Sequence, residues 1–236
     1  MPSLKEKQII FFMFPEINGK LNIENTVVFY LLYNNIYWSD CIMHSIKIIK
    51  KNQQKTSLWS GGKTTQLAIY PENADYSLRN FNWRISTAEV EVEESLFTHL
   101  PGINRVIMIL EGEMYLEHEG QRSVYLRPFD LDRFDGEWTT RSKGKVTDFN
   151  LMLANGFEGD LSAIHLGKVN PDVRLVLNGQ TEIFYCVDGT VHVDASEDEA
   201  FLLEKGDTMI INSEVRNITL QRDKDINTSI IRASIY

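Results

Sequence analysis

One strand–turn–strand–corner unit occurs twice in this sequence, at a constant offset of 77 residues. Gly112 follows an apolar run in the first copy, and Gly189 follows one in the second. The same offset relates Asp130 to Asp207, at the next corner of each copy. A Gly after an acidic residue favours a tight turn between two strands. Two copies of such a unit predict a pair of small β-barrels or jelly rolls.

The rest of the chain supports an all-β fold. From residue 64 onward, short apolar runs alternate with Gly, Pro, Asp and Asn, and helical periodicity is almost absent. The chain has 236 residues, 43% of them hydrophobic, which is enough for two small cores. We therefore expect a first barrel over residues 43–155 and a second over residues 156–236.

The first 42 residues differ in character from the rest. Ile9–Phe14 and Thr26–Tyr33 are apolar and aromatic, but each is far shorter than a membrane span. No small-residue cleavage site follows a basic start, so a secretory signal is not expected. We hypothesise that the native protein starts at Met43, where a strand-like segment begins; the alternative is a genuine extension. An intact Met1 peptide from native protein would exclude the first reading.

The repeat resembles the cupin superfamily, and two copies in one chain resemble a bicupin with RmlC-like jelly-roll barrels. Many cupins hold a metal through His-x-His, a Glu and a later His. In the first copy Arg105 occupies the position of that Glu; in the second Glu182 occupies it, but no His-x-His precedes it. A metal site needs three or four converging donors. We expect no catalytic metal and no cofactor in either copy.

The charge and the cysteines limit the partners and the compartment. The chain has 24 Lys plus Arg against 33 Asp plus Glu, a formal charge of −9, and no basic stripe. This pattern argues against nucleic-acid binding. Cys41 and Cys186 are far apart and form no metal or disulfide motif, which indicates a reducing, cytoplasmic compartment and no membrane association.

Polar side chains interrupt several apolar strands of the first repeat. In a strand, Arg84 and Ser86 share the face opposite Trp83, and Asp148 and Asn150 share one face. Buried polar groups need partners or a ligand. The arginines could converge on the aspartate as an ion-pair network, or stay free as a fork for a carboxylate. The remaining alternative is a polar cluster that fixes strand register.

From these segments we predict a ligand site and assign no catalytic residue. Arg84 and Arg105 would anchor an anion, and Asp148 and Asn150 would add polar contacts. An aromatic side chain such as Trp83 would supply wall area. The full predicted set is Trp83, Arg84, Ser86, His99, Arg105, Asp148 and Asn150.

The same segments resemble the HutD/Ves family. The resemblance rests on Trp59-Ser60-Gly61-Gly62, Asn82-Trp83-Arg84-Ile85-Ser86, Leu100-Pro101-Gly102-Ile103, Phe134-Asp135-Gly136 and Asp148-Phe149-Asn150-Leu151-Met152, in that order. It covers roughly residues 43 to 236 and is strongest up to Met152. Gly61-Gly62-Lys63 departs from a more Gly-rich form of the turn, and the first 42 residues lie outside the family pattern.

The resemblance implies a metal-free bicupin without a secure catalytic activity. Members are associated with histidine utilisation or described as stress-induced, and the implied ligand is a small carboxylate such as formylglutamate or urocanate. A metal-independent isomerase or hydrolase of a small acidic metabolite is the alternative, with His99, Glu182 or Asp148 as acid or base. A third reading is an interaction protein whose barrels pair edge to edge; two copies could also form a homodimer.

Overall fold

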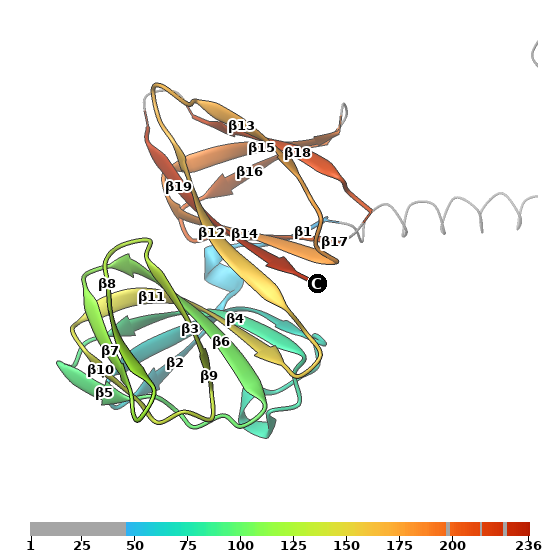
Figure 1. The fold of residues 1–236 in the computed structure, drawn as a ribbon. Helices are drawn as coiled ribbons and strands as arrows, with labels where there is room; N and C mark the ends of the chain where they lie inside the picture. The colour runs from blue at the N-terminus through green and yellow to red at the C-terminus, as the bar shows by residue number, and fades with distance from the viewer. Residues whose placement is uncertain (1–45, 197–198, 213, 224–225) are drawn as a thin grey trace, which may run out of the picture. The chain divides into compact units, whose positions relative to one another are not determined.

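The computed structural model describes residues 46–236, with gaps at residues 197–198, 213 and 224–225. The predicted leader over residues 1–42 lies outside this part. The described chain is built of strands with two 3-10 turns, η1 (Lys51–Gln53) and η2 (Tyr76–Leu78), which confirms the all-β prediction (Figure 1). No helix in the described residues has the length and hydropathy needed to cross a membrane.

The first barrel consists of a six-stranded and a four-stranded sheet. The larger sheet has the order β2 (Lys55–Trp59), β3 (Gly62–Tyr70), β4 (Trp83–Val90), β11 (Val146–Ala154), β6 (Ile103–Glu111) and β9 (Leu131–Asp135). The smaller has the order β5 (Glu94–Leu96), β10 (Thr140–Lys143), β7 (Met114–His118) and β8 (Arg122–Leu126). Apolar side chains from both sheets pack together between them, among them Ile107 and Leu116.

The second barrel repeats this plan. Its larger sheet has the order β1 (Ile46–Ile49), β17 (Thr208–Asn212), β14 (Thr181–Asp188), β19 (Thr228–Ile235) and β12 (Gly159–Leu166). Its smaller sheet has the order β13 (Asp172–Val176), β18 (Asn217–Arg222), β15 (Thr190–Ser196) and β16 (Glu199–Glu204). The described interior is an apolar cluster that includes Phe184, Cys186, Leu203 and Ile230. The tandem barrels predicted from the repeat are therefore present.

The two copies share the same corner chemistry. In the first, the Asp130 carboxylate accepts a hydrogen bond from the Arg127 backbone N–H at 3.0 Å. In the second, the Asp207 carboxylate accepts one from the Glu204 backbone N–H at 3.1 Å. Both aspartates thus close the corner that the 77-residue offset placed at equivalent positions.

Backbone conformation at the turns also follows the offset. Gly112 and Gly189 have φ values of +81° and +79°. At the corner, Gly206 has a φ of +92° and its counterpart Phe129 has +70°. Phe129 is a bulky residue in the left-handed region that normally favours glycine, so the surrounding corner imposes the conformation.

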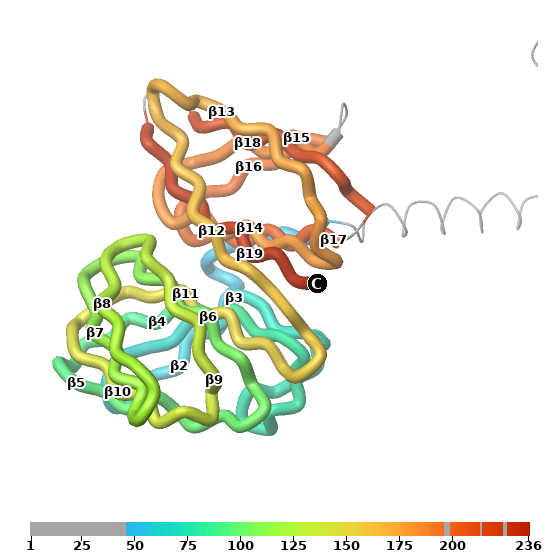
Figure 2. Tube along the Cα trace, viewed as in Figure 1, coloured from blue at the N-terminus to red at the C-terminus, as the bar shows by residue number. Residues whose placement is uncertain are grey.

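The division between the barrels differs from the predicted boundaries at the start of the chain. The predicted first barrel, residues 43–155, includes Ile46–Ile49, but this strand, β1, pairs antiparallel with β17 of the second barrel (Figures 1 and 2). Ile46 and Ile48 pack against the second apolar cluster. The chain therefore begins its described part in the second barrel and reaches the first at β2.

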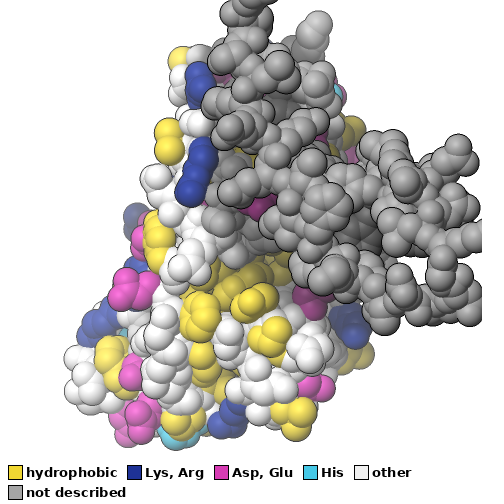
Figure 3. Space-filling view, turned by 90° about the vertical axis from the view of Figure 1, so that its right-hand side faces the viewer, with side chains coloured by type: hydrophobic (Ala, Val, Ile, Leu, Met, Phe, Trp, Pro, Cys, Tyr) yellow, Lys and Arg dark blue, Asp and Glu magenta, His cyan; other side chains and the backbone are white. Residues whose placement is uncertain are grey.

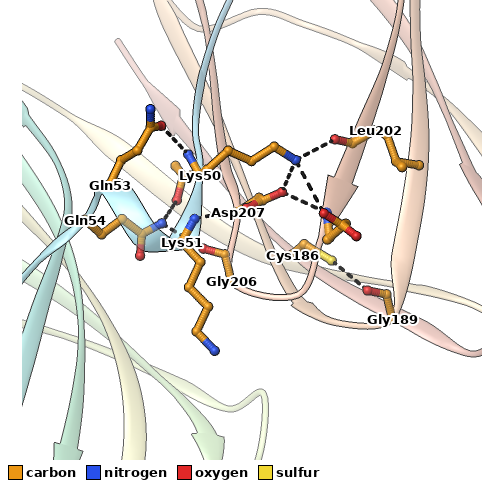
Figure 4. A network of polar contacts seen from close by, with 11 residues as sticks. Lys50, Lys51, Gln53, Gln54, Cys186, Gly189, Leu202, Gly206 and Asp207 are labelled. Carbon is orange, nitrogen blue, oxygen red and sulfur yellow. Dashed lines mark hydrogen bonds and ion pairs between the residues drawn. The ribbon is translucent and has the colours of Figure 1, made fainter.

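A polar network holds this segment in place (Figure 4). The buried Asp207 carboxylate accepts hydrogen bonds from Lys50 Nζ at 2.6 Å and from the Lys51 backbone N–H at 3.0 Å. Gln54 Nε2 donates to the Gly206 carbonyl at 2.7 Å. Asp207 thus stabilises the corner after β16 and also holds the segment that follows β1. Local sequence patterns do not reveal this second role.

Strands β2 and β3 have no counterpart among the described strands of the second barrel. In the first barrel's larger sheet β4 lies next to β11, and in the second barrel's larger sheet the equivalent strand β12 lies next to β19. Among the described strands, the first sheet continues beyond β4 with β3 and β2, whereas the second ends at β12. Hydrogen-bonded pairing joins β2 to β3 and β3 to β4. The extension widens the first barrel on one side.

The two larger sheets pack against each other through one apolar cluster. Ile85 and Leu151 contribute from the first barrel, and Ile183 and Ile231 from the second; all four are fully buried. Burial of such a side chain stabilises a fold by about 1.5–3 kcal/mol. Because β4 and β11 place their apolar residues in this shared core, their alternate residues face the interior of the first barrel.

Candidate functional site

The predicted polar residues lie in adjacent rows on the inner face of the larger first-barrel sheet. Met152 of β11 is paired with Arg84 of β4 on one side and with Arg105 of β6 on the other. The two arginines are thus two strand spacings apart, about 10 Å between Cα atoms. Asn150 is paired with Ser86 in the next row along β11, and Asp148 follows two residues further.

These side chains border a cavity of about 610 Å³. Strands β2, β3, β4, β6 and β11 contribute to its wall, together with residues 74–77 and 95–98. The additional strands β2 and β3 form one side, so the cavity depends on the part of the sheet that the second barrel lacks. Its size suits a small metabolite.

The rim of the cavity is partly apolar. Leu58 of β2 and Leu96 of β5 border it and are 83% and 60% exposed. Other exposed apolar side chains occur on the first barrel, and Figure 3 shows a face on which hydrophobic side chains gather beside polar ones. The cavity therefore combines a polar interior with an apolar entrance.

Arg84 is buried and held by neighbouring side chains. Its Nε donates to Gln66 Oε1 at 2.9 Å, and its Nη1 donates to Ser86 Oγ at 3.0 Å. The guanidinium lies over the Tyr76 ring, 4.3 Å from the centroid. Burial lowers the pKa of Arg84, and Tyr76 acts in the opposite direction. The side chain is fixed, with part of its donor capacity already used.

Arg105 is equally buried but differs in its hydrogen bonding. Its guanidinium lies against Phe97 and Phe134, at 4.6 and 5.2 Å from the ring centroids. Its Nε is buried and has no hydrogen-bond partner in the described residues. Burial lowers the pKa of Arg105 to about 10, which still leaves the group charged at neutral pH. An unpartnered buried guanidinium is a strong anion-binding group.

Asp148 and Asn150 each have a buried side-chain oxygen, Oδ1, without a partner among the described residues. Burial raises the pKa of Asp148 to about 7, although the charge on Arg105 acts to lower it. Within the described part of the chain, no ion pair joins Asp148 to Arg84 or Arg105. Of the two arrangements left open by the sequence, the structure has partly free arginines rather than an ion-pair network.

Two of the seven predicted site residues lie elsewhere. Trp83 is on the opposite face of β4, in the core shared by the barrels, where its ring stacks on Tyr70 at 5.7 Å. His99 is exposed on a loop and does not border the cavity. Trp83 belongs to the odd-numbered, core-facing set of its strand, and His99 lies outside any strand that faces the barrel interior.

Three important wall residues were not predicted. Gln66 shares a face of β3 with Thr64, so strand alternation could have identified it. Tyr76 lies in η2, which Asp75 caps by accepting hydrogen bonds from the Ser77 backbone N–H and hydroxyl. Phe97 follows β5. No periodic pattern distinguishes Tyr76 or Phe97, because their positions depend on loop conformation.

The second barrel has a satisfied polar cluster at the equivalent place. Glu182 is paired with Ser234 on β19, as Arg105 is paired with Met152 on β11. Its carboxylate accepts hydrogen bonds from Arg232 at 2.8 and 2.9 Å and from Ser234 Oγ at 2.7 Å. The backbone N–H groups of Asn178 and Gly179 donate two more. Burial raises the pKa of Glu182, but these hydrogen bonds outweigh it, and the net pKa is lowered.

The described residues contain no group of three His, Cys, Asp or Glu side chains placed to hold a metal ion. The buried His118 bonds Asp132 and Thr140, each at 2.8 Å. This pair lies outside the cavity wall, and Arg122 completes it with an ion pair to Asp132 at 2.6 Å. It is a closed structural cluster, unlike the open one around Arg105.

Sequence comparisons identify relatives of the chain. A protein from Pseudomonas putida, described as an uncharacterised 21.2 kDa protein in the hutC 3′ region, is 32% identical over 116 residues, covering 48% of this chain and 60% of that protein. Protein Ves from Escherichia fergusonii is 31% identical over 103 residues, covering 41% and 51%. The chain thus spans between half and three fifths of the length of these curated relatives.

Solved structures share the fold at low sequence identity. HutD from Pseudomonas fluorescens has a TM-score of 0.63 and 22% identity, covering 81% of this chain and 99% of that one. A conserved protein of unknown function from Pseudomonas aeruginosa has a TM-score of 0.69 and 20% identity, covering 80% and 98%. Oxalate decarboxylase from Bacillus subtilis has a TM-score of 0.54 and 10% identity, covering 79% and 76%.

These likenesses agree with the tandem cupin-like fold described above. The match to a family model extends much further along the chain than the curated relatives do. The HutD model matches residues 51–228, which include every strand of the first barrel, most of the second barrel and every residue of the cavity wall. The chain therefore belongs to the HutD family.

Proposed function

We propose that this protein is a non-catalytic bicupin that binds a small carboxylate in the first-barrel cavity. The observation that carries the proposal is Arg105: it is 6% exposed, charged, and its Nε has no partner in the described chain. A carboxylate can accept two parallel hydrogen bonds from one guanidinium, which gives orientation as well as affinity.

The two arginines would have different tasks. Gln66 and Ser86 hold Arg84, so it would present its remaining donors from a fixed position. Arg105 would supply the bidentate contact, while Phe97 and Phe134 keep its plane in place. Such preorganisation reduces the entropy lost when a ligand binds.

A role in sensing or modulating histidine utilisation is the biological part of the proposal. It is supported by the family name and by the relative encoded in a hutC region. Formylglutamate and urocanate, both small carboxylates, are the proposed ligands, and the cytoplasm is the proposed compartment. The cavity volume of about 610 Å³ accommodates either molecule.

Ligand-induced thermal shift tests the proposal, because a ligand that binds only the folded state raises the melting temperature. Formylglutamate, urocanate and glutamate would each be added at millimolar concentration to the wild type and to Arg105→Met. At least one should raise the melting temperature of the wild type and have little effect on the variant. Unchanged melting temperatures with all three would exclude this function.

A metal-independent isomerase or hydrolase is the second candidate. Asp148 favours it, since a buried carboxyl with a pKa of about 7 can act as acid or base near neutral pH. The other two candidate bases lack this setting: His99 is exposed and Glu182 is fully hydrogen-bonded in the second barrel. Turnover of a small acidic metabolite that Asp148→Asn abolishes while binding persists would support catalysis.

A further inference from the structure

The unpartnered atoms of the cavity differ in what they require. Arg105 Nε is a hydrogen-bond donor and needs an acceptor. Asp148 Oδ1, on a side chain that is 3% exposed, is an acceptor when ionised and needs a donor. Asn150 can offer either its oxygen or its nitrogen by rotation of the amide. Asp148 therefore restricts the ligand more than Asn150 does, because only a ligand with a hydrogen-bond donor can satisfy its Oδ1.

Glu182 shows what this fold supplies to a buried carboxylate that has a structural role. Five hydrogen bonds reach its two oxygens, from Arg232, Ser234 and two backbone N–H groups. Asp148 lies on β11, the counterpart of β19, yet its Oδ1 receives none from the described residues. The second barrel thus provides hydrogen-bond donors to its buried Glu182, whereas the described part of the first barrel provides none to Asp148 Oδ1. A bound ligand could supply that donor.

The charges in the cavity limit the ligand further. Two buried cations, Arg84 and Arg105, and one buried carboxylate, Asp148, leave a single positive charge to be balanced. Lys55 and Asp75 add opposite charges, and only at the exposed rim. A ligand with a net charge of −1 neutralises the interior, and unbalanced charge in a buried site is costly.

We propose that the ligand class is a carboxylate that also carries an N–H or O–H donor, and that a net charge of −1 favours binding further. The carboxylate binds Arg105 and the donor binds Asp148 Oδ1. Amino dicarboxylates and N-acylated or hydroxylated acids meet this description; simple dicarboxylates and keto acids do not. This inference rests on the proposed carboxylate site and specifies which carboxylates it accepts.

Three molecules with the same five-carbon skeleton test the inference by calorimetric titration at pH 7.5. Glutamate carries an ammonium donor and a net charge of −1, 2-hydroxyglutarate a hydroxyl donor, and 2-oxoglutarate only a carbonyl acceptor at that position. The last two both have a net charge of −2, so the comparison between them isolates the donor. We expect the affinity to fall in that order, with at least a tenfold difference between glutamate and 2-oxoglutarate. Buried polar groups left unpaired account for discrimination of this size.

Asp148→Asn is the diagnostic variant, because its amide can turn to donate to the carbonyl of 2-oxoglutarate. The preference for glutamate should fall at least tenfold in this variant. Asp194→Asn on the exposed face of β15 is the matched control and should keep the wild-type preference. Circular dichroism would verify folding; if Asp148→Asn does not fold, the wild-type series alone decides.

The outcomes separate this inference from the proposed function. Equal affinity of the wild type for glutamate and 2-oxoglutarate, with binding abolished by Arg105→Met, would leave the carboxylate site intact and overturn the donor requirement. Absence of binding for all three would overturn the donor requirement together with this class of ligand, while formylglutamate and urocanate would still test the carboxylate site itself.

Discussion

Asp148 is the residue at which this protein departs furthest from the usual rule for buried carboxylates. It is buried in a strand, but its Oδ1 has no donor in the described residues. Burial raises its pKa from 3.8 to about 7. The folded protein therefore keeps a proton at pH values where the unfolded chain has lost it, and the site costs stability as the pH rises. Such a cost is typical of a residue retained for function.

The free energy of unfolding should depend on pH through this group. Between pH 4 and pH 7 the folded state binds more protons at Asp148 than the unfolded state does, so stability falls with rising pH. Asp148→Asn removes this loss, and its stability relative to the ligand-free wild type should increase by roughly 2 kcal/mol from pH 5 to pH 8. Urea unfolding at both pH values measures the difference; an equal gap at both would contradict the assignment.

At this scale the sequence predicted the site through strand alternation. Arg84, Ser86, Asp148 and Asn150 share a face by their spacing, and all border the cavity. The same alternation places Trp83 on the other face, so its assignment to the wall gave more weight to its aromatic character than to its position. The loop residues Tyr76 and Phe97 could not be found, because loop geometry carries no comparable period.

At the scale of elements, two equivalent strand pairs, one in each barrel, differ in whether their buried charged side chain has hydrogen-bond partners. Strands β6 and β11 bring Arg105 beside Met152, whereas β14 and β19 bring Glu182 beside Ser234. In the second barrel Arg232 completes the cluster. In the first, no described side chain does so for Arg105 Nε. The same scaffold therefore carries a closed structural cluster in one barrel and an open one in the other.

Substitutions at these equivalent positions should have different effects on stability. Glu182→Ala leaves Arg232 without its partner and should reduce the free energy of unfolding by about 3 kcal/mol or more. Arg105→Met removes a buried charge without an ion-pair partner and should change it by less than about 1 kcal/mol. Chemical denaturation of both variants tests the contrast. A large loss for Arg105→Met would mean that its role is structural.

The elements themselves were only partly predictable. The repeat identified the hairpins and corners, because the glycines and aspartates at those places have local conformational roles. A strand-like segment was expected near residue 46, but its partner β17 lies more than 150 residues away in the sequence. The pairing depends on the Asp207 network and on packing against the second core, neither of which leaves a local pattern.

At the scale of the whole molecule, the two barrels share a core. The described residues belong to one compact unit, and the cluster between the larger sheets includes Leu151 of the first barrel and Ile231 of the second. A continuous core of this kind favours cooperative unfolding. The first barrel, with its cavity, is therefore supported by packing against the second.

Damage to the first barrel should consequently expose the second. Leu151→Ala should destabilise the protein by about 2–5 kcal/mol. Cys186, fully buried in the second barrel, should then become reactive at a lower urea concentration. Pulse alkylation followed by mass spectrometry of the Cys186 peptide measures this. Leu58→Ala, at an 83% exposed position, is the control; an unchanged Cys186 midpoint in Leu151→Ala would show that the barrels unfold independently.

Isothermal titration of formylglutamate, urocanate and glutamate into the wild type and Arg105→Met tests the central claim, a carboxylate site at Arg105, most directly. We predict millimolar or tighter binding of at least one of the three to the wild type. Because a hydrogen bond to a charged group contributes about 1.5–3 kcal/mol, affinity should fall roughly 10- to 100-fold in the variant. Equal affinities in the two proteins, or no binding of any of the three to the wild type, would contradict the claim.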